Sequence, residues 1–395
     1  MTKHISILTG LKNNLDYTKL FYSSTRALYP DVELVFVSHN STDGTHDWLD
    51  SLNDPHLVYE YGTVDKTFSD TFNRCAELAS RDYVLFAHND MVLSPCFLEN
   101  VAKVISERRV VIYSTIEPPI FSDHERDGKV IRDFGLDVES VDVDGIYAFS
   151  KDYQVKLKVS ALKTEQGSFF MCLHRATLLG IGGMDPLFNP MFREDDDLLI
   201  RLKLLGLDIH IALDALCYHF VSKTSRFSEE YEQRTSVIET NSHRNFIRKW
   251  RFSNTSSVQK SYDIGFVLRH STPELIHEIE PWCTCIYVDT GNSAYILAEQ
   301  LNTRMDLGER VKDISFIAEH DIIVHADGNR SAAKVLAKVG RLNEVVFKRI
   351  RRKHAFFTGI TDQIKNIFAP LRIVIRKERS HERELINRNT DDEVS

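Results

Sequence analysis

The feature that most constrains the fold is a regular alternation of short apolar runs with segments of helical pattern. We expect strands of five or six residues at 5–9, 32–37, 57–61 and 83–87. We expect helices between them, at 17–28, 45–52 and 68–79. Strands that alternate with helices of this length are typical of a doubly wound α/β domain. The sequence therefore predicts an α/β fold with a mixed, mainly parallel sheet.

Polar residues follow two of these expected strands. Residues 38–45 form a polar loop with Gly44 after the second strand, and His88, Asn89 and Asp90 come directly after the fourth. In open α/β sheets, ligands bind outside the carboxyl ends of the strands. Both loops are therefore candidate ligand sites. A purely structural role also remains open, because aspartates in such positions commonly form turns or cap helices.

A second candidate region begins with four consecutive acids at 194–197. They precede Leu198, Leu199, Leu202 and Leu205, a spacing that places apolar residues on one helix face. Acids at the start of a helix interact favourably with its dipole, so the block is compatible with a structural role alone. His219 follows two strand-like stretches, 209–213 and 215–218, and is compatible with an ordinary, partly buried histidine.

Taken together and in this order, the motifs of the first 250 residues or so resemble those of family 2 glycosyltransferases, which have the GT-A fold. The segments that carry the resemblance are 40–45, Phe68 to Arg74, 88–90, 127–130 with Gly135, 182–185, 194–198 and His219. The resemblance implies transfer of a hexosyl or pentosyl group from a nucleotide-diphosphate sugar, such as a UDP- or dTDP-sugar. It implies a hydroxyl of a glycan or lipid-linked molecule as the acceptor.

The resemblance also implies a divalent cation, Mn²⁺ or Mg²⁺, which neutralises the charge of the departing diphosphate. Asp90 corresponds to the family's metal-binding carboxylate, and His219 to a histidine that approaches the metal. His88 stands where the family's Asp-X-Asp motif has its first acid, so this motif is expected to supply one ligand fewer.

The remaining site residues are implied by the same resemblance. The donor-binding residues are Thr9, Asn40, Asp43, Asn73 and Asn89. Asp195 is the expected general base, which takes the proton of the acceptor hydroxyl, and Glu194 is its rival. A single base opposite the leaving group implies inversion at the anomeric carbon. Asp197 and Arg201 are expected to hold the start of the helix.

Beyond this region the sequence predicts further organisation. The polar run 253–257 indicates a linker, which divides the chain into a domain at 1–252, a small α/β domain at 259–345 and a basic tail at 346–395. In the small domain we expect strands at 262–268, 283–288, 314–317 and 322–324. Helices are expected near 273–279, 294–301 and 332–339. The small domain resembles no family.

Charge is distributed unevenly. Residues 341–388 hold 13 Lys and Arg against 5 Asp and Glu, whereas the chain as a whole has a net charge of −8. A basic end indicates contact with phosphates of lipids or nucleic acid, or simply a solvated helix face. Two alternatives to a glycan-directed enzyme therefore stay open. One is a glycosyltransferase acting on modified bases of DNA, for example viral DNA, and the other is an inactive sugar-nucleotide-binding scaffold.

The compartment is inferred from what the sequence lacks. No apolar run approaches the roughly 18–20 residues of a membrane span, and the N-terminus has the pattern of a strand, not of a signal peptide. The six cysteines match neither a zinc pattern nor a disulfide framework. We expect a cytoplasmic protein, with a peripheral position at the inner membrane face or in a host cytoplasm as variants. The sequence does not predict an oligomeric state.

Overall fold

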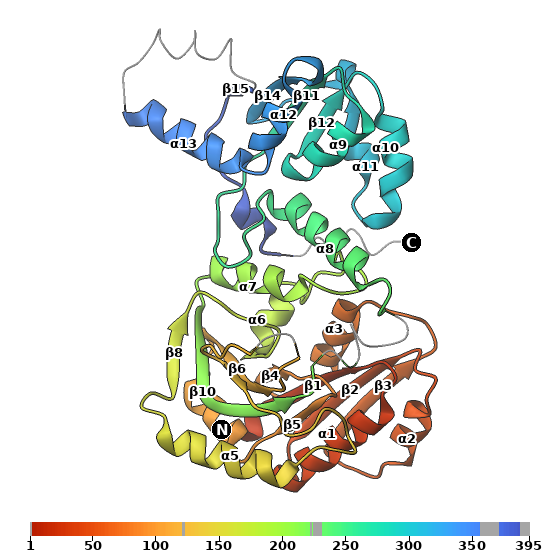
Figure 1. Ribbon diagram of the computed structural model, residues 1–395, viewed down its shortest axis with the longest axis vertical. Coiled ribbons are helices and arrows are strands. Elements are labelled where there is room, and N and C mark those ends of the chain that lie inside the picture. The colour runs from red at the N-terminus through yellow and green to blue at the C-terminus, as the bar shows by residue number, and fades with distance from the viewer. Residues whose placement is uncertain (1, 121–122, 222, 224–230, 356–370, 388–395) are drawn as a thin grey trace. The chain divides into compact units, whose positions relative to one another are not determined.

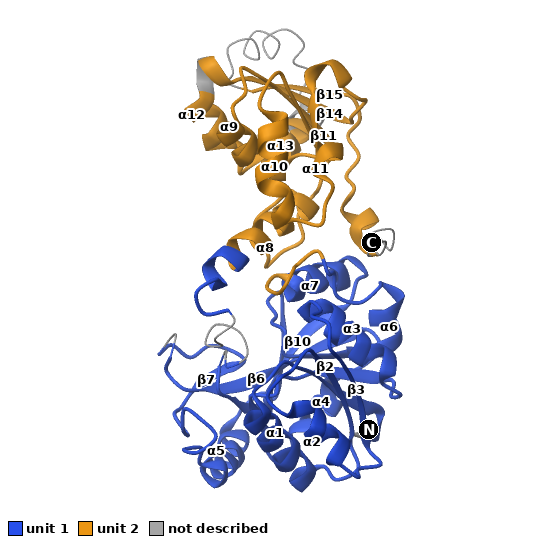
Figure 2. Ribbon diagram, turned by 90° about the vertical axis from the view of Figure 1, so that its right-hand side faces the viewer, with its two compact units in different colours: residues 1–186, 194–238 blue, residues 187–193, 239–395 orange. Residues whose placement is uncertain are grey.

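The computed structural model describes residues 2–120, 123–221, 223, 231–355 and 371–387 (Figure 1). Its chain forms two compact units, which Figure 2 shows in different colours. Unit 1 comprises residues 1–186 and 194–238, and unit 2 comprises residues 187–193 and 239–395.

Unit 1 is built on a ten-stranded sheet in which eight strands follow the order β3-β2-β1-β4-β9-β6-β10-β5. Strands β7 and β8 pair with β6 and β10 off this path. Pairing is parallel from β3 to β4 and between β6 and its neighbours β7 and β10, whereas β5, β8 and β9 run antiparallel to their partners. The predicted mixed, mainly parallel sheet is thus confirmed. The strands are β1 (Ile5–Leu11), β2 (Glu33–His39), β3 (Leu57–Gly62), β4 (Tyr83–Phe86), β5 (Met91–Leu93), β6 (Arg109–Glu117), β7 (Lys129–Ile131), β8 (Ala161–Thr164), β9 (Met171–His174) and β10 (Asp208–His219).

The helices of this part of the chain lie close to the expected positions. The three expected between the first strands are present as α1, α2 and α3, and a capping box of Thr67 and Asp70 begins α3. Such a box satisfies backbone N–H groups that a helix start leaves free. The helices up to the linker are α1 (Leu15–Leu28), α2 (Thr45–Ser51), α3 (Phe68–Leu78), α4 (Phe97–Val104), α5 (Val143–Lys156), α6 (Arg175–Gly180), α7 (Glu194–Leu204) and α8 (Thr235–Trp250), after the 3₁₀ turn η1 (Thr2–His4).

Strand β10 is irregular at its middle. Along β6 the pairing advances by one residue, from Tyr113 to Ser114, while along β10 it advances by four, from Ala212 to Leu216. An irregularity of this kind bends a strand and changes where the following side chains point. After it, β10 runs in register with the end of β6 and ends at His219.

Unit 2 contains a five-stranded sheet of order β13-β12-β11-β14-β15, in which only β15 runs antiparallel to its neighbour. Its strands are β11 (Ile264–Arg269), β12 (Cys285–Val288), β13 (Val311–Asp313), β14 (Ile322–Asp327) and β15 (Arg372–Ile375). Its helices are α9 (Pro273–Ile279), α10 (Asn292–Glu299), α11 (Leu307–Arg310), α12 (Gly328–Val339) and α13 (Leu342–Ala355). Four 3₁₀ turns complete it: η2 (Glu280–Trp282), η3 (Gln300–Asn302), η4 (Ile314–Phe316) and η5 (Glu382–Leu385).

Two expectations for this part of the chain differ from the structure. The strand expected at 314–317 is the 3₁₀ turn η4, because the Asp313 carboxylate accepts hydrogen bonds from Ser315 and closes a turn there. The described part of the expected tail at 346–395 lies within unit 2. There α13 contributes buried Val346 and Ile350 to the core, and β15 pairs with β14.

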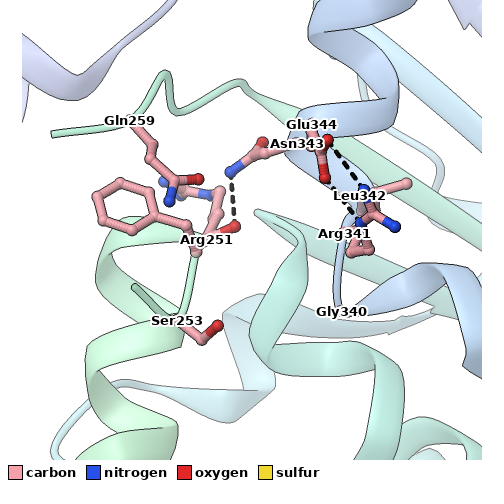
Figure 3. A pocket seen from close by; sticks show the side chains of 9 residues that line it. Arg251, Ser253, Gln259, Gly340, Arg341, Leu342, Asn343 and Glu344 are labelled. Carbon is pink, nitrogen blue, oxygen red and sulfur yellow. Dashed lines mark hydrogen bonds and ion pairs between the residues drawn. The ribbon is translucent and has the colours of Figure 1, made fainter. Parts of the chain in front are cut away.

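A small pocket lies in unit 2, at the end of α8 and the turn between α12 and α13 (Figure 3). It has a volume of about 160 Å³ and is lined by residues 251–253, Gln259 and residues 340–344. Across it the Asn343 amide donates a hydrogen bond of 2.6 Å to the Arg251 carbonyl oxygen, and Arg341 pairs with Glu344. Among the described residues, the buried atoms Arg251 Nε and Asn343 Oδ1 have no hydrogen-bond partner. None of the described helices, in either unit, has the length and apolar character that crossing a membrane requires.

Candidate active site

Three side chains that could hold a metal ion meet at the carboxyl ends of the strands in unit 1. His88 and Asp90 lie in the turn between β4 and β5, and His219 is the last residue of β10. One ligand atom from each lies within 4.8 Å of the other two. His88 Nδ1 is 3.8 Å and His219 Nε2 is 3.6 Å from Asp90 Oδ1. The structure therefore brings together the predicted pair, Asp90 and His219, and adds His88.

The surroundings of this group fit a divalent cation. Asp90 is 1% exposed and His219 is 6% exposed, and neither Asp90 Oδ1 nor His219 Nε2 has a hydrogen-bond partner among the described residues. Buried polar atoms are rarely left without a partner unless an ion or ligand completes them. One carboxylate and two imidazoles form a donor set that suits Mn²⁺ and similar ions. The predicted cation site is confirmed as a group able to bind such an ion.

Local electrostatics differ between the two histidines. Burial lowers the pKa of His88 to about 4, so its imidazole is neutral and able to ligate a metal at neutral pH. Burial also lowers the pKa of His219, but the carboxylates of Asp90 and Glu117 outweigh that effect and raise it. Burial raises the pKa of Glu117, and the opposing contacts with His219 and Lys129 lower it to about 2.

Glu117 is a residue of this site that the sequence interpretation missed. It ends β6, is 7% exposed, and its Oε1 lies 3.5 Å from His219 Nδ1. Lys129 on β7 forms an ion pair with its other oxygen. An available signal was its position at the end of an apolar run, where a charged side chain is unusual.

Two predicted donor-binding residues, Asp43 and Asn40, lie in the loop after β2. Asp43 Oδ2 accepts from the Leu15 backbone N–H at 2.8 Å, and Asp43 Oδ1 accepts from the Thr45 hydroxyl. Both carboxylate oxygens of Asp43 thus join the starts of α1 and α2. Asn40 has a φ of 55°, and its amide donates to Asp65. These contacts position the loop.

The other three predicted donor residues are more enclosed. Thr9 is 0% exposed and Asn89 is 1% exposed, with the Asn89 amide donating to the Thr18 hydroxyl. Asn73 exchanges two hydrogen bonds with the backbone of Met184. The turn there needs Gly183, because its φ is 73° and an added Cβ would lie 2.2 Å from Asn73 Oδ1. In this structure Asn73 therefore anchors the 183–184 turn.

The acidic block at 194–197 occupies the first turn of α7. Asp197 and Arg201 are both 0% exposed and form an ion pair of 2.8 Å, and Arg201 also donates to the carbonyl oxygens of Ile181 and Gly183. Asp195, the predicted general base, is half-buried, and Glu194 is 6% exposed. Asp197 thus fixes the helix start, whereas Asp195 retains contact with solvent.

Comparison with solved structures gives distant similarities. The mannosyltransferase PcManGT from Pyrobaculum calidifontis, in complex with GDP-Man and Mn²⁺, aligns with a TM-score of 0.42 and 16% identity, over 62% of this chain and 63% of that one. S. aureus TarS 1-349 aligns with a TM-score of 0.40 and 15% identity, over 62% and 72%. GalNAc-T7 with UDP, GalNAc and Mn²⁺ aligns with a TM-score of 0.42 and 10% identity, over 54% and 43%.

Two sequence comparisons were informative, one with curated proteins and one with protein-family models. The search of curated proteins gave no match. Residues 6–164 match the family model described as glycosyl transferase family 2. These residues contain β1 except for its first residue, and β2 to β8, and with them Asp90 and Glu117. The resemblance inferred from the motifs is therefore confirmed by the family model for this part of the chain.

Proposed function

We propose that the protein transfers a hexosyl or pentosyl group from a nucleotide-diphosphate sugar to a hydroxyl of a glycan or lipid-linked acceptor, with inversion at the anomeric carbon. The observation that carries the proposal is the group of His88, Asp90 and His219 at the carboxyl ends of the sheet, in which Asp90 and His219 are buried. It lies where open α/β sheets bind their ligands, and two of its residues belong to the segment that matches the family model.

The divalent cation, when bound, neutralises the negative charge that develops on the departing diphosphate. In this chain Asp90 and His219 would hold it, with His88 as a third ligand. Asp90 and His219 are buried, which excludes water from their side chains, and electrostatic interactions strengthen where water is excluded. The Lys223 backbone N–H donates to Asp90 Oδ2 at 3.1 Å, which fixes the carboxylate and leaves Oδ1 available.

Proton transfer is the second task. We propose that Asp195 is the general base that accepts the proton of the acceptor hydroxyl, with Glu194 as the alternative base. Asp195 is half-buried, like Asp196, and its Oδ1 accepts the backbone N–H of Asp196 at 2.9 Å. The buried Asp197–Arg201 pair fixes the helix turn on which Asp195 stands. A base on a fixed turn keeps its distance to the acceptor constant, as acid–base catalysis requires.

The experiment that tests this function is donor cleavage in the presence of Mn²⁺, across a panel of UDP-, dTDP- and GDP-sugars. We expect wild-type protein to cleave one donor class, with loss of cleavage when Mn²⁺ is chelated. Asp195→Asn should bind the same donor without cleaving it. If wild-type protein neither binds nor cleaves any donor of the panel, the enzyme proposal fails and the inactive scaffold is the better account.

The acceptor is tested separately, once the donor is known. A labelled donor offered to glycan and lipid-linked acceptors, followed by analysis of the product linkage, reports both the acceptor and the stereochemistry. We expect a product whose anomeric configuration is opposite to that of the donor. A product of retained configuration would contradict the single-base mechanism and the role of Asp195 in it.

A further inference from the structure

Glu117 has no role in the transfer proposed above. It is a buried carboxylate at the end of β6, whose last residues pair with β7 on one side and with β10 on the other. The register places Tyr218 of β10 opposite Ile116, and Ile131 of β7 opposite Glu117. One neighbouring strand therefore brings His219 beside Glu117, and the other brings Lys129.

Two local features of the chain create this arrangement. The irregularity in β10 between Ala212 and Leu216 sets the register in which His219 reaches the level of Glu117. On the other side, Gly128 has a φ of 81°, a conformation that favours glycine, in the turn that begins β7. The Thr115 N–H donates to the Gly128 carbonyl oxygen at 3.0 Å and holds that turn against β6.

The two oxygens of Glu117 face different partners. Oε1 accepts a hydrogen bond of 2.9 Å from the Thr115 hydroxyl and lies 3.5 Å from His219 Nδ1. Oε2 pairs with the Lys129 ammonium group. Because Lys129 and Thr115 fix the carboxylate on both sides, its Oε1 presents a fixed acceptor to the imidazole of His219.

This contact determines which ring nitrogen of His219 is available. When Nδ1 carries the proton and donates it to Glu117, Nε2 keeps its lone pair. Nε2 faces Asp90 Oδ1 at 3.6 Å and has no hydrogen-bond partner among the residues that the structure describes. A carboxylate that holds one nitrogen of a ligating histidine fixes the tautomer and the orientation of the ring.

We propose that Glu117 is a positioning residue that holds His219 in the Nδ1–H tautomer with Nε2 directed to the metal, and that Lys129 acts through Glu117. This inference rests on the proposed metal-dependent function. Glu117 itself does not touch the donor or the acceptor in this account. Its effect is on metal affinity, which can be measured without turnover.

The test is Mn²⁺ binding to the full chain without donor, measured by calorimetry or by the electron paramagnetic resonance signal of free Mn²⁺. Glu117→Ala should weaken Mn²⁺ binding by roughly 10- to 100-fold, the usual effect of losing such a partner. Lys129→Met should weaken it less, because Glu117 keeps Thr115 and His219 as partners. Glu125→Gln is the matched control: Glu125 is a half-exposed carboxylate that pairs with Arg132, and this variant should bind Mn²⁺ like wild type.

A second readout separates positioning from a purely structural role. In ¹⁵N-histidine spectra of the metal-free protein, recorded at a pH high enough for the His219 imidazole to be neutral and with its signal assigned through His219→Gln, wild type should show the Nδ1–H tautomer. Glu117→Ala should shift His219 toward the Nε2–H form, while its unfolding midpoint is compared with that of wild type. Lys129→Met provides the same spectrum should Glu117→Ala fail to fold.

Three outcomes contradict the inference in distinguishable ways. Unchanged Mn²⁺ affinity and tautomer in a folded Glu117→Ala variant would overturn the role of Glu117 alone. Weaker Mn²⁺ binding with an unchanged His219 tautomer would also overturn it, because the loss would then have another cause. If wild-type protein does not bind Mn²⁺, both this inference and the metal-dependent function fail.

Discussion

Two acids at the start of α7, Asp195 and Asp197, stand two positions apart in very different surroundings. Asp197 is fully buried and paired with Arg201, whereas Asp195 is half-buried. Breaking a buried ion pair by removing one partner leaves an uncompensated charge, which costs about 3–5 kcal/mol of stability. Asp195→Asn keeps the size of a half-buried side chain that retains contact with solvent, so we expect a smaller cost there. The two positions therefore allow a structural effect to be separated from a chemical one.

We expect Asp195→Asn to lower the transfer rate by about 10²- to 10⁴-fold, the usual contribution of a general base, with unfolding free energy within about 0.5 kcal/mol of wild type. Asp197→Asn should lower the unfolding free energy by about 3–5 kcal/mol because Arg201 stays buried without its carboxylate. Urea denaturation and turnover of the identified donor measure the two quantities. Equal turnover of wild type and Asp195→Asn would exclude Asp195 as the base and leave Glu194 as the candidate.

At the scale of single residues, the sequence predicted where the candidate metal site lies but not all of the residues that form it. Asp90 and His219 were identified through the resemblance to the family's motifs, and both lie at the carboxyl ends of strands, where open α/β sheets bind ligands. His88 was treated as the loss of a ligand, whereas the structure places its ring in the metal group. Glu117 lies at the end of an apolar run, but its role was missed because its partners Lys129 and His219 are brought to it only by the pairing of β6 with β7 and β10.

In unit 2, a partly buried hydrogen-bond network around His320 connects residues at β11, β12 and β14. Its Nδ1 lies 2.8 Å from Asp263, which precedes β11, and its Nε2 lies 2.7 Å from the Tyr287 hydroxyl of β12. Burial lowers the pKa of His320, but Asp263 and Cys285 outweigh it and raise it to about 9. Burial raises the pKa of Asp263, and His320 outweighs it, lowering it to about 2. Gly265 leaves room for the imidazole, since an added Cβ would lie 2.4 Å from its Cδ2.

These pKa values predict how the stability of unit 2 depends on pH. A raised histidine pKa contributes stability that is complete below about pH 6.5, its unfolded value, and is lost as the pH rises through about 9. A lowered aspartate pKa contributes stability above about pH 4 that is lost as the pH falls through about 2. We therefore expect a plateau between about pH 4 and 6.5, with decreasing stability on both sides.

Urea unfolding at pH 5.5, 7.5 and 9 tests this prediction in a Trp48→Phe background. Of the chain's three tryptophans, Trp250 and Trp282 remain in that background, and both belong to unit 2. The unfolding midpoint should fall from pH 5.5 to 9. A His320→Asn variant should be less stable at pH 5.5 and change little with rising pH. The same pH dependence in wild type and variant would show that another group is responsible.

Some helices and strands were predicted correctly and others were not, for local physical reasons. A continuous apolar run such as 83–87 identifies a buried strand, because a strand that is covered on both faces of its sheet has apolar side chains on both sides. The short run 314–317 misled the prediction. Phe316 is 70% exposed and Ile317 is 43% exposed, so apolar character there does not report burial. The irregularity in β10 has no sequence signal of its own, since it depends on pairing with β6.

At the scale of the whole molecule, the basic C-terminal region bears on whether DNA is the acceptor. In the described part of α13, Val346 and Ile350 are buried in the core of unit 2, and Lys348 and Arg341 both pair with Glu344. Some of the positive charge is thus neutralised within the helix. The chain as a whole carries a net charge of −8, which opposes nonspecific binding to nucleic acid.

We therefore expect no retention of duplex DNA at 0.15 M salt, measured by the fluorescence anisotropy of a labelled oligonucleotide over a salt series. A protein that neutralises several phosphates shows an affinity that falls steeply with salt concentration. Binding with such a dependence, reduced in a Lys348→Gln and Arg351→Gln double variant, would contradict this expectation and favour DNA as the acceptor.

The division into units depends on contacts that sequence reading does not reveal. A boundary was expected at the polar run 253–257, whereas residues 187–193 and 239–252 cluster with the C-terminal unit. Within unit 2 the Ser242 hydroxyl donates to the Met191 carbonyl oxygen at 2.8 Å, and buried Arg248 pairs with Glu280 and Glu299. Polar linker composition indicates where a chain turns, but buried ion pairs such as these determine which side of the turn a helix joins.

The central claim is that a metal held by Asp90 and His219 binds the diphosphate of a sugar donor. Its most direct test is calorimetric binding of UDP, dTDP and GDP in the presence of Mn²⁺ or of a chelator, with wild type and Asp90→Ala. We predict that Mn²⁺ tightens the binding of at least one nucleotide by tenfold or more, about 1.4 kcal/mol, and that Asp90→Ala abolishes this gain. Nucleotide affinities of the wild type that are the same with Mn²⁺ and with chelator would contradict the account.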